Sequence, residues 1–321
     1  MINVTAYVDG KVHVSERVDP EWVAIGSTAL VWVDISGPTA EEGRLLSEVF
    51  HFHELSIEDA LSTRHHPKIE SYGGYLYFIL HGIDFNPSAH RFATHDVDFF
   101  LGPRYLVTVH DGKHRSVSYV RDLCGKSGHV IEEGTAALAH RIIDAMIDNY
   151  RPEVDELGAQ LDEIERVVFE RPDRELMRNI LALKSDVASL RTVTLPQRDV
   201  IARLSRREFP IISESMAYRF RDVHDQLVRI TDEAMYFQDR ISGLLDAHLS
   251  GVSNSLNQVM KVLTLMSTVF MPLTVITGVY GMNVRLPQFP GGEGAQFWWV
   301  VGSMALSTAL MVWFFRSRRW L

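Results

Sequence analysis

Two long runs of apolar residues near the C-terminus dominate the hydrophobic pattern of the chain. Leu263–Tyr280 holds 18 residues without a charge, and Phe297–Phe315 holds 19 more. At 1.5 Å per residue, each run is long enough to cross the ~30 Å hydrocarbon core of a bilayer as a helix. Neither run has the polar face that a helix on the surface of a soluble protein shows. The pattern therefore predicts a transmembrane domain of two spans in residues 261–321.

The residues that flank these runs argue against the alternative of two buried core helices. Tryptophans lie at both ends of the second run, where an aromatic belt is expected, at Trp298, Trp299 and Trp313. Lys261 precedes the first run, and three arginines follow the second, Arg316, Arg318 and Arg319. By the positive-inside rule both flanks are cytoplasmic, so the connecting loop 281–296 faces outward. We therefore expect a multi-pass protein of the cell inner (plasma) membrane with both termini in the cytoplasm.

Upstream of the spans, short β-rich runs alternate with turn and helix signals through about residue 133. The expected strands are Met1–Gly10, Val31–Ile35, Tyr75–Ile83, Val97–Leu101 and Tyr105–Val109. Thr39–Leu61 between them is typical of helix. These patterns predict a cytoplasmic α+β domain over residues 1–133.

From about residue 134 to residue 260 the pattern is helical. Two amphipathic stretches repeat apolar residues every three or four positions, one over Val154–Val168 and one over Leu176–Leu190. Pro172 separates them and predicts an antiparallel helical hairpin. No proline occurs between Pro210 and Pro272, so one helix of about 90 Å could run from residue 220 through the first span to residue 280. Residues 134–260 are thus a predicted helical funnel and stalk.

A seam of residues follows this long helix at alternating steps of three and four. Its members, here called the seam, are Asn257, Met260, Thr264, Ser267, Met271, Thr274 and Gly278. A sustained 3.5-residue period predicts a bundle of several such helices. Much of the seam is small or polar although it lies inside a membrane. Two interpretations stay open at this point, namely close helix packing through small residues and the lining of a water-filled pore.

The charges divide between the two parts of the chain. The total of 41 acidic and 32 basic side chains gives −9, yet residues 261–321 hold five basic residues and one acid, which is +4 and leaves −13 on residues 1–260. An acidic body excludes a general nucleic-acid partner. The chain has no phosphate-cradling G-x-x-x-x-G-K-[ST] loop, so no nucleotide partner is expected. The single cysteine, Cys124, excludes an internal disulfide framework and is expected to be a small buried hydrophobe.

The end of the first span carries the most specific motif, Tyr280-Gly281-Met282-Asn283. A G-M-N tripeptide at this place, shortly before a second span at the C-terminus, resembles the CorA superfamily of divalent-cation channels. The resemblance continues upstream and covers nearly the whole chain. Further similar stretches are His53–Asp59, Arg64–Tyr72, Tyr218–Asp225, Ser242–Leu245 and residues 253–274.

The resemblance implies a homopentamer with one long helix per subunit lining a pore, and no catalytic site. Gly281, Met282 and Asn283 would form an external selectivity ring. The implied conduit residues are Asn257, Met260, Leu263, Met271, Thr274 and Gly278, with Met260, Leu263 and Met271 as hydrophobic constrictions. All but Leu263 belong to the seam. Intracellular metal would gate the channel at Asp222, with an acid of a neighbouring N-terminal domain, for which Asp84 is the candidate.

The ion is expected to be Mg²⁺, with Co²⁺ and Ni²⁺ as further substrates, moved inward by the membrane potential. Mg²⁺ gives up its waters reluctantly, and neutral amide oxygens of an Asn283 ring would hold the hydrated ion without stripping it. Two features depart from magnesium-type members, because Arg285 follows the motif and Glu293 is the only acid of the loop. Zinc or another transition metal, with coupling to protons as an option, therefore stays open as the alternative. The 14 histidines, including His51, His53, His65 and His66, could support it.

Two other classes of protein are alternatives to a transporter. A membrane-anchored enzyme could gather His95, Asp96, Asp98 and His110 on one face of a sheet. The chain has no H-E-x-x-H, G-x-S-x-G or cysteine-based metal spacing, which disfavours this interpretation. A purely structural scaffold is the second alternative. The prediction is a transporter rather than an enzyme.

Overall fold

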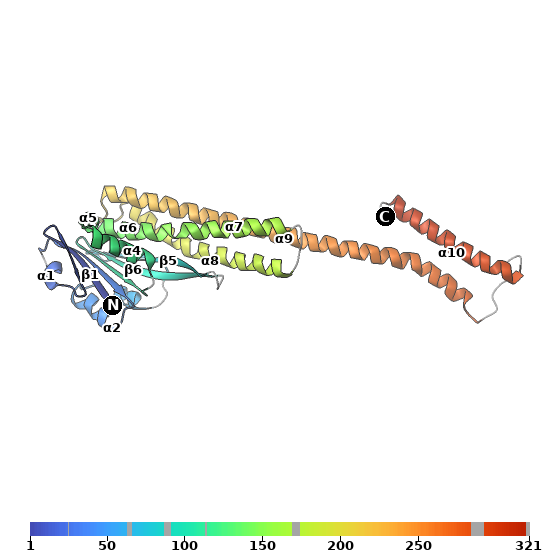
Figure 1. Ribbon diagram of the computed structural model, residues 1–321, viewed down its shortest axis with the longest axis horizontal. Helices are drawn as coiled ribbons and strands as arrows, with labels where there is room; N and C mark the ends of the chain where they lie inside the picture. The colour runs from blue at the N-terminus through green and yellow to red at the C-terminus, as the bar shows by residue number, and fades with distance from the viewer. Residues whose placement is uncertain are drawn as a thin grey trace. The chain divides into compact units, whose positions relative to one another are not determined.

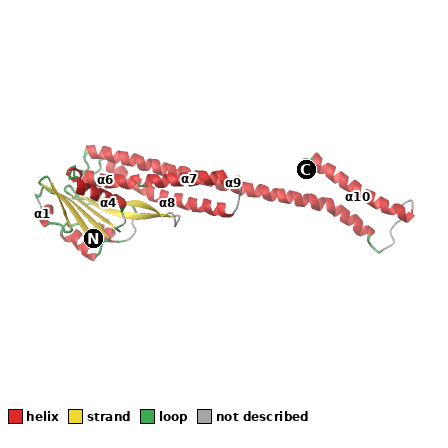
Figure 2. Ribbon diagram, viewed as in Figure 1, coloured by secondary structure: helices red, strands yellow, loops and turns green. Residues whose placement is uncertain are grey.

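The computed structural model describes residues 1–24, 26–62, 66–86, 91–112, 114–168, 174–283 and 292–318. They form two compact units, Met1–Leu244 and Leu245–Leu321. The first unit combines a β-sheet with helices, and the second holds the apolar helices (Figures 1 and 2). The finer division of the chain at residues 133 and 260 stays a prediction.

A seven-stranded mixed sheet organises the first unit. Its strands are β1 (Ile2–Val8), β2 (Lys11–Ser15), β3 (Leu30–Ser36), β4 (Ile69–Ser71), β5 (Leu76–Asn86), β6 (Arg91–Leu101) and β7 (Tyr105–His110). They lie in the order β2-β1-β3-β7-β6-β5-β4. β3 and β7 pair in parallel, whereas the other neighbouring strands pair antiparallel. The parallel pair needs a crossover between its strands, and the intervening chain, residues 37–104, supplies it.

Each face of the sheet is covered by helices. On one face, α2 (Ala40–Glu48) and α3 (Glu54–Leu61) pack over a core of Val31, Val33, Val107 and Phe100, and α1 (Pro20–Val23) lies against β3. On the other face lie α4 (Arg115–Lys126), α5 (His129–Glu132) and α6 (Thr135–Asp148). The alternation of side chains along each strand supplies both faces, and the central strands are buried on both sides.

The predicted strands are confirmed, and the structure adds elements that the sequence pattern did not separate. β5 and β6 are longer than predicted, with 11 residues in each strand. The stretch Thr39–Leu61 is two helices rather than one. The chain turns between them, where His51 has a positive φ of 52°, and the His53 side chain then caps α3 by accepting a hydrogen bond from the Leu55 N–H. Cys124 is fully buried and free, as expected.

Three long helices follow. α7 (Tyr150–Val168) and α8 (Arg174–Ser205) pack together through the predicted apolar stripes. Pro172, the predicted break between them, lies outside the described residues. α9 (Glu214–Tyr280) has 67 residues, so it is about 100 Å long and begins six residues before the predicted start. The single long helix is thereby confirmed, and it continues through Pro272.

The sheet contains a buried carboxyl group whose removal should change stability. Asp98 on β6 is 6% exposed and accepts a 2.5 Å hydrogen bond from the Tyr77 hydroxyl. Burial raises the pKa of Asp98 to about 7, and the nearby charge of Asp96 acts in the same direction while the Tyr77 hydroxyl opposes it. The pKa of an aspartate in the unfolded chain is about 3.9, so the folded state binds this proton more tightly than the unfolded state does. The protein therefore loses stability as pH rises from 4 to 7.

Asp98→Asn is expected to raise stability at pH 8 by up to about 4 kcal/mol, because an amide still accepts from Tyr77 but carries no buried charge. The advantage over wild type should grow between pH 4 and pH 7 and stay constant above. Melting curves of the purified protein across this range measure it. Asp199→Asn is the control, since the Asp199 side chain is 77% exposed. An equal gain in both variants, or a gain independent of pH, would contradict a raised pKa of Asp98 as the cause.

Candidate ion pathway

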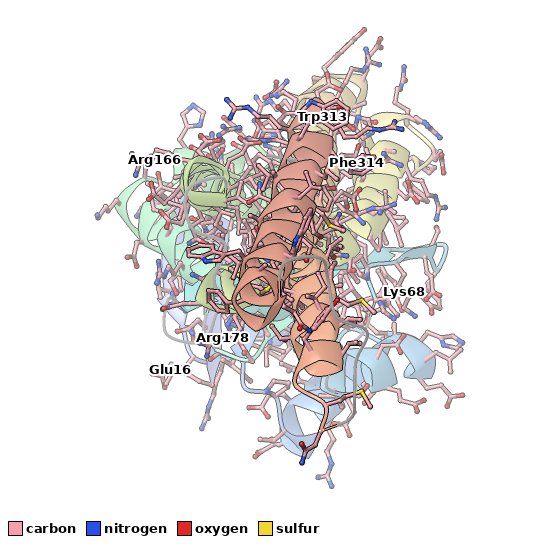
Figure 3. All side chains as sticks on the ribbon, turned by 90° about the vertical axis from the view of Figure 1, so that its right-hand side faces the viewer. Glu16, Lys68, Arg166, Arg178, Trp313 and Phe314 are labelled. Carbon is pink, nitrogen blue, oxygen red and sulfur yellow. The ribbon has the colours of Figure 1, made fainter. Side chains whose placement is uncertain are left out.

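Two helices in the second unit are long and apolar enough to cross a membrane. They are the C-terminal part of α9 and α10 (Gly292–Ser317). Large apolar side chains on both are exposed, among them Phe270 (62%) and Trp298 (72%). Trp313 and Phe314 likewise project from α10 (Figure 3). Exposed apolar surface of this extent is expected of helices that face lipid.

Burial along α9 distinguishes two sides of the helix. The partly buried residues recur at helical spacing and are Leu265, Thr268, Val269, Pro272, Leu273, Ile276 and Tyr280. All seven seam residues and Leu263 are exposed. At about 100° per residue, the seam lies roughly 140° around the helix from the partly buried stripe. α10 carries a corresponding partly buried stripe at Val300, Met304, Met311 and Phe315. This pattern fits an α10 that covers one side of α9 and leaves the seam open.

The seam combines hydroxyl oxygens with large apolar side chains. Thr264 and Thr274 each donate their hydroxyl hydrogen to a backbone carbonyl one turn earlier, those of Met260 (2.7 Å) and Phe270 (2.9 Å). The hydroxyl hydrogen is therefore occupied, and the oxygen lone pairs remain to accept hydrogen bonds from water. Met271 on the same side is 70% exposed. The side thus offers acceptors for a hydrated cation, interrupted by apolar side chains.

α9 ends directly before the G-M-N motif. The Gly281 N–H donates to the Thr277 carbonyl oxygen at 2.8 Å, and the Met282 N–H donates to the Val279 carbonyl oxygen at 3.3 Å. These two bonds close the last turn and leave Gly281, Met282 and Asn283 exposed at the end of the helix. The predicted filter residues are therefore adjacent on one turn. Arg285 and the rest of 284–291 lie outside the described residues.

Gly281 has a steric role that the motif alone does not explain. A Cβ added there would lie 2.9 Å from the Thr277 carbonyl oxygen, which real Cβ atoms essentially never do. Gly281→Ala is therefore expected to displace Asn283 and to lower ion flux at least tenfold while the folded yield stays near wild type. Flux into proteoliposomes and size-exclusion profiles measure the two effects. Gly294→Ala is the control because its Cβ would meet nothing within 4 Å. Wild-type flux in Gly281→Ala would contradict this role.

The predicted regulatory acid Asp222 is exposed on α9, where Gln226 donates to it at 3.4 Å. The structure brings Asp144 on α6 within electrostatic reach of Asp222, and Asp148 lies one turn further along α6; the sequence did not predict either acid there. Burial raises the pKa of Asp144, His140 opposes that shift, and the negative charges of Asp148 and Asp222 add to it. The i, i+4 spacing of Asp144 and Asp148 on a helix was the available signal. Asp222 therefore belongs to an acidic face formed by α6 and α9.

Asp84, the proposed partner of Asp222, lies in β5 opposite Ala93, and its side chain is outside the described part. Among the described residues, no three or more His, Cys, Asp or Glu side chains are grouped so that they could hold a metal ion. The regulatory pairing of Asp222 with Asp84 thus stays a prediction about two subunits.

Several histidines have local roles in the fold. His53 caps α3, and the ring of His51 contacts the Ser47 carbonyl oxygen at 3.1 Å. His65 lies outside the described residues. His110 is fixed by two bonds, because its Nδ1 accepts from the Gly112 N–H and its Nε2 therefore donates to Asp34. These contacts give the side chains of His51, His53 and His110 structural roles that require no metal.

The expectation that His95, Asp96, Asp98 and His110 could share one face of the sheet is wrong. Neighbouring residues on a strand point to opposite faces, and β6 therefore separates His95 from Asp96 and Asp98. His95 pairs with Asp111 at 2.6 Å, whereas Asp96 lies 3.4 Å from His81. No single catalytic constellation forms from these four side chains.

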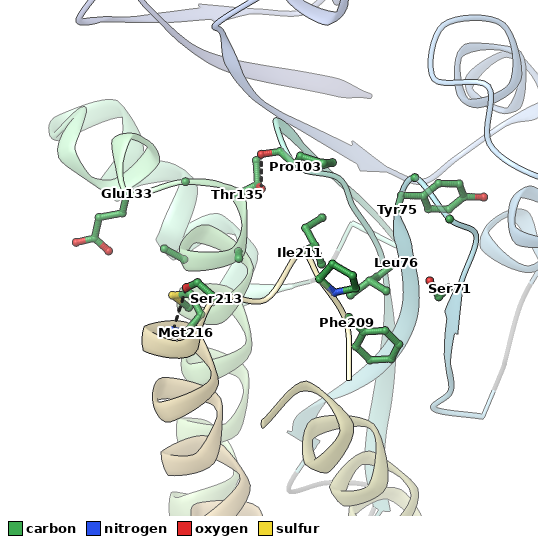
Figure 4. Close-up of a pocket in the computed structure, with 16 residues that line it drawn as sticks. Ser71, Tyr75, Leu76, Pro103, Glu133, Thr135, Phe209, Ile211, Ser213 and Met216 are labelled. Carbon is green, nitrogen blue, oxygen red and sulfur yellow. Dashed lines mark hydrogen bonds between the residues drawn. The ribbon is translucent and has the colours of Figure 1, made fainter. Parts of the chain in front are cut away.

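A cavity of about 500 Å³ lies in the first unit between the β4–β5 turn, the start of α6 and the segment before α9 (Figure 4). Leu76, Phe209 and Ile211 give it apolar walls. Glu133 at its edge is buried enough to oppose ionisation, but hydrogen bonds from Arg219 and Arg141 outweigh this and lower its pKa. Because that carboxylate is already neutralised by two arginines, the cavity offers no cation site.

The comparisons with known proteins agree with the geometry of the apolar helices. Residues 27–319 match the family described as CorA-like Mg²⁺ transporter protein. The chain belongs to this family. Its members are transporters of divalent cations, so the prediction of a transporter rather than an enzyme is confirmed, as is the predicted resemblance.

Two relatives show the range of ions within the family. The cobalt/magnesium transport protein CorA of Thermotoga maritima is 32% identical over 298 residues, which are 92% of this chain and 84% of that protein. The zinc transport protein ZntB of Yersinia pseudotuberculosis is 23% identical over 299 residues, 92% of this chain and 89% of that protein. Similarity to a cobalt/magnesium transporter is therefore the stronger of the two.

The fold matches that of a solved CorA structure over nearly its whole length. The structure of the CorA magnesium transporter from Methanocaldococcus jannaschii superposes with a TM-score of 0.84 at 22% identity, covering 100% of this chain and 99% of that one. The predicted architecture of an α/β domain, a long helix and two C-terminal apolar helices is confirmed.

Proposed function

We propose that this protein is a homopentameric channel for the influx of Mg²⁺, and also of Co²⁺ and Ni²⁺, across the cell inner membrane. The observation that carries the proposal is the exposed seam of α9, which leads directly to Gly281-Met282-Asn283 in a chain of the CorA-like family. Five copies of this seam around one axis would enclose a water-filled path. α10 of each subunit would lie outside the ring of α9 helices and face lipid.

The chemistry of the proposed filter suits a hydrated dication. Five Asn283 amide oxygens would accept hydrogen bonds from the waters that Mg²⁺ keeps. A ring of carboxylates would hold the ion too tightly for it to leave. An inside-negative potential contributes about 4.6 kcal/mol per 100 mV to a doubly charged ion, at ~2.3 kcal/mol per charge. The potential can therefore drive influx without nucleotide hydrolysis.

Gating is proposed to depend on the acidic face around Asp222. The negative charges of Asp148 and Asp222 repel the carboxylate of Asp144 when no cation is present, and a divalent ion between neighbouring subunits would relieve that repulsion. Metal bound to Asp222, with Asp84 of a neighbour as the predicted partner, would hold the ring closed. Its loss would let α9 helices move apart and the constrictions at Met260, Leu263 and Met271 become wet.

Zinc transport is the second candidate, supported by the 23% identity to ZntB. Arg285 after the motif does not decide between the ions. A positive residue near the entrance weakens the attraction of dications in general and favours no single ion. The retained Met282 and the higher identity to a cobalt/magnesium transporter favour magnesium.

Proteoliposomes with an inside-negative potential test the proposal. Equal concentrations of Mg²⁺, Co²⁺, Ni²⁺ and Zn²⁺ are offered with and without a proton gradient, and the initial fluxes are compared. We expect Mg²⁺, Co²⁺ and Ni²⁺ to enter, with rates that follow the potential and ignore the proton gradient. Zn²⁺ flux that requires the proton gradient would establish the second candidate instead. Absence of flux for all four ions would refute transport by the isolated protein.

A further inference from the structure

A small basic cleft lies in the first unit at the corner where α8 ends and α9 begins. Its volume is about 230 Å³. The cleft is lined by Ser205, Arg206, Arg207, Glu214, Ala217, Tyr218 and Arg221. Three arginines therefore face one carboxylate. This local charge of +2 occurs in a part of the chain, residues 1–260, whose total is −13.

The long helix supplies one wall of this cleft. Glu214, Tyr218 and Arg221 recur at steps of four and three on the first two turns of α9, so they share one face. The Arg221 guanidinium lies 5.3 Å from the centre of the Tyr218 ring, which holds it against the wall. Within the described part of the chain, neither Arg206 nor Arg221 forms an ion pair with a carboxylate.

The end of α8 supplies the opposite wall, and its backbone is unusual. Arg207 has a φ of 59°, in the left-handed region that favours glycine at the residue after a helix. An arginine there costs more than the glycine that such a position normally takes. Its guanidinium reaches Glu214 at 3.4 Å, but both side chains are more than half exposed, so this ion pair contributes little. Stability alone thus gives no reason for arginine at 207.

We propose that this cleft binds a phosphate group. Arginine forks match the geometry of phosphate oxygens and form two parallel hydrogen bonds to them. Arg206 and Arg221 would each bind one edge of the anion, and Arg207 would turn from Glu214 toward it. The concave shape and volume favour a small anion over the competing occupant, an acidic surface of a second subunit, which would need a broader contact. The phosphate is either inorganic or part of an organic ester.

Titration calorimetry on the full-length protein in detergent tests the proposal at constant ionic strength. Inorganic phosphate, pyrophosphate and ATP are titrated separately, with chloride as the blank. We expect saturable binding of at least one of them, and the ranking of the three identifies the source of the phosphate group. The double variant Arg206→Gln/Arg221→Gln should weaken binding at least tenfold. Arg178→Gln/Arg229→Gln is the matched control, because it removes two exposed arginines outside the cleft, one from α8 and one from α9.

Arg207→Gly separates binding from folding. Glycine accepts the left-handed backbone, so this variant should melt at a higher temperature than wild type and yet bind phosphate more weakly. Equal weakening in the control pair would refute the cleft as the site, as would absence of saturable binding to all three anions. A cleft double variant that dissociates the oligomer, in a protein that binds no phosphate, would assign the arginines to a subunit contact and overturn the proposal.

Discussion

Asn283→Ala is expected to lower Mg²⁺ influx into proteoliposomes at least tenfold while the protein still assembles. In the proposed pentamer the substitution removes five amide oxygens from one ring. Each hydrogen bond from a water of the hydrated ion contributes about 1 kcal/mol net, and 1.4 kcal/mol corresponds to a factor of ten. Loss of even two such bonds in the transition state for entry is therefore sufficient for a tenfold lower influx. Asn283 is exposed directly after α9, so the truncation leaves no cavity in a core.

The matched control is Gln296→Ala, which removes an amide from the beginning of α10. This variant should transport at the wild-type rate, because Gln296 lies outside the seam. Asn283→Asp adds a second test, since five carboxylates should bind the dication more tightly and release it more slowly. We expect saturation at a lower Mg²⁺ concentration together with a lower maximal flux. Wild-type flux in Asn283→Ala would refute the selectivity ring, and equal losses in Asn283→Ala and Gln296→Ala would show a general defect of the outer loop.

Much of the architecture is predictable from the sequence because it depends on local periodicity. The uncharged run Leu263–Tyr280 predicts a membrane-spanning helix, and the repeat in Val154–Val168 predicts an amphipathic helix and the face that it buries. Neither prediction needs long-range information. The central strands are likewise visible as apolar runs. β2 and β4 are not, because β2 is largely exposed and β4 has only three residues. The break at His51 depends on one residue in the left-handed region, which composition does not indicate.

The parts of the candidate site that were missed depend on contacts between distant segments. Asp144 and Asp222 are 78 positions apart, and only the packing of α6 beside α9 brings their charges together. Arg206 directly follows α8 and Arg221 lies on α9, and they share a cleft only because the chain turns sharply between them. The opposite error concerns His95 and Asp96, which are adjacent in sequence but on opposite faces of β6. Sequence proximity was informative along α9 because one continuous helix preserves it.

Met271→Ser is expected to make the channel conduct when it should be closed. In the proposed pentamer Met271 forms an apolar constriction, and a ring of five hydrated hydroxyl groups would no longer exclude water. Vesicles loaded with millimolar Mg²⁺, which would hold the cytoplasmic domains in the closed state, are challenged with external Ni²⁺. Wild-type protein should admit little Ni²⁺ under these conditions, and Met271→Ser should admit at least tenfold more, measured as quenching of an enclosed metal indicator.

Met266→Ser is the control because the chain offers the same residue type on the same helix, five positions away. Both methionines are exposed, 57% at Met266 and 70% at Met271, so either serine lies outside the core of the single chain. At about 100° per residue, Met266 lies roughly 140° around α9 from Met271 and off the seam. A serine there would face lipid or α10 and should leave the channel closed. Leak through both variants would indicate a loosened bundle, and leak through Met266→Ser alone would place the pore on the other side of α9. Only leak confined to Met271→Ser agrees with a gate formed by the seam.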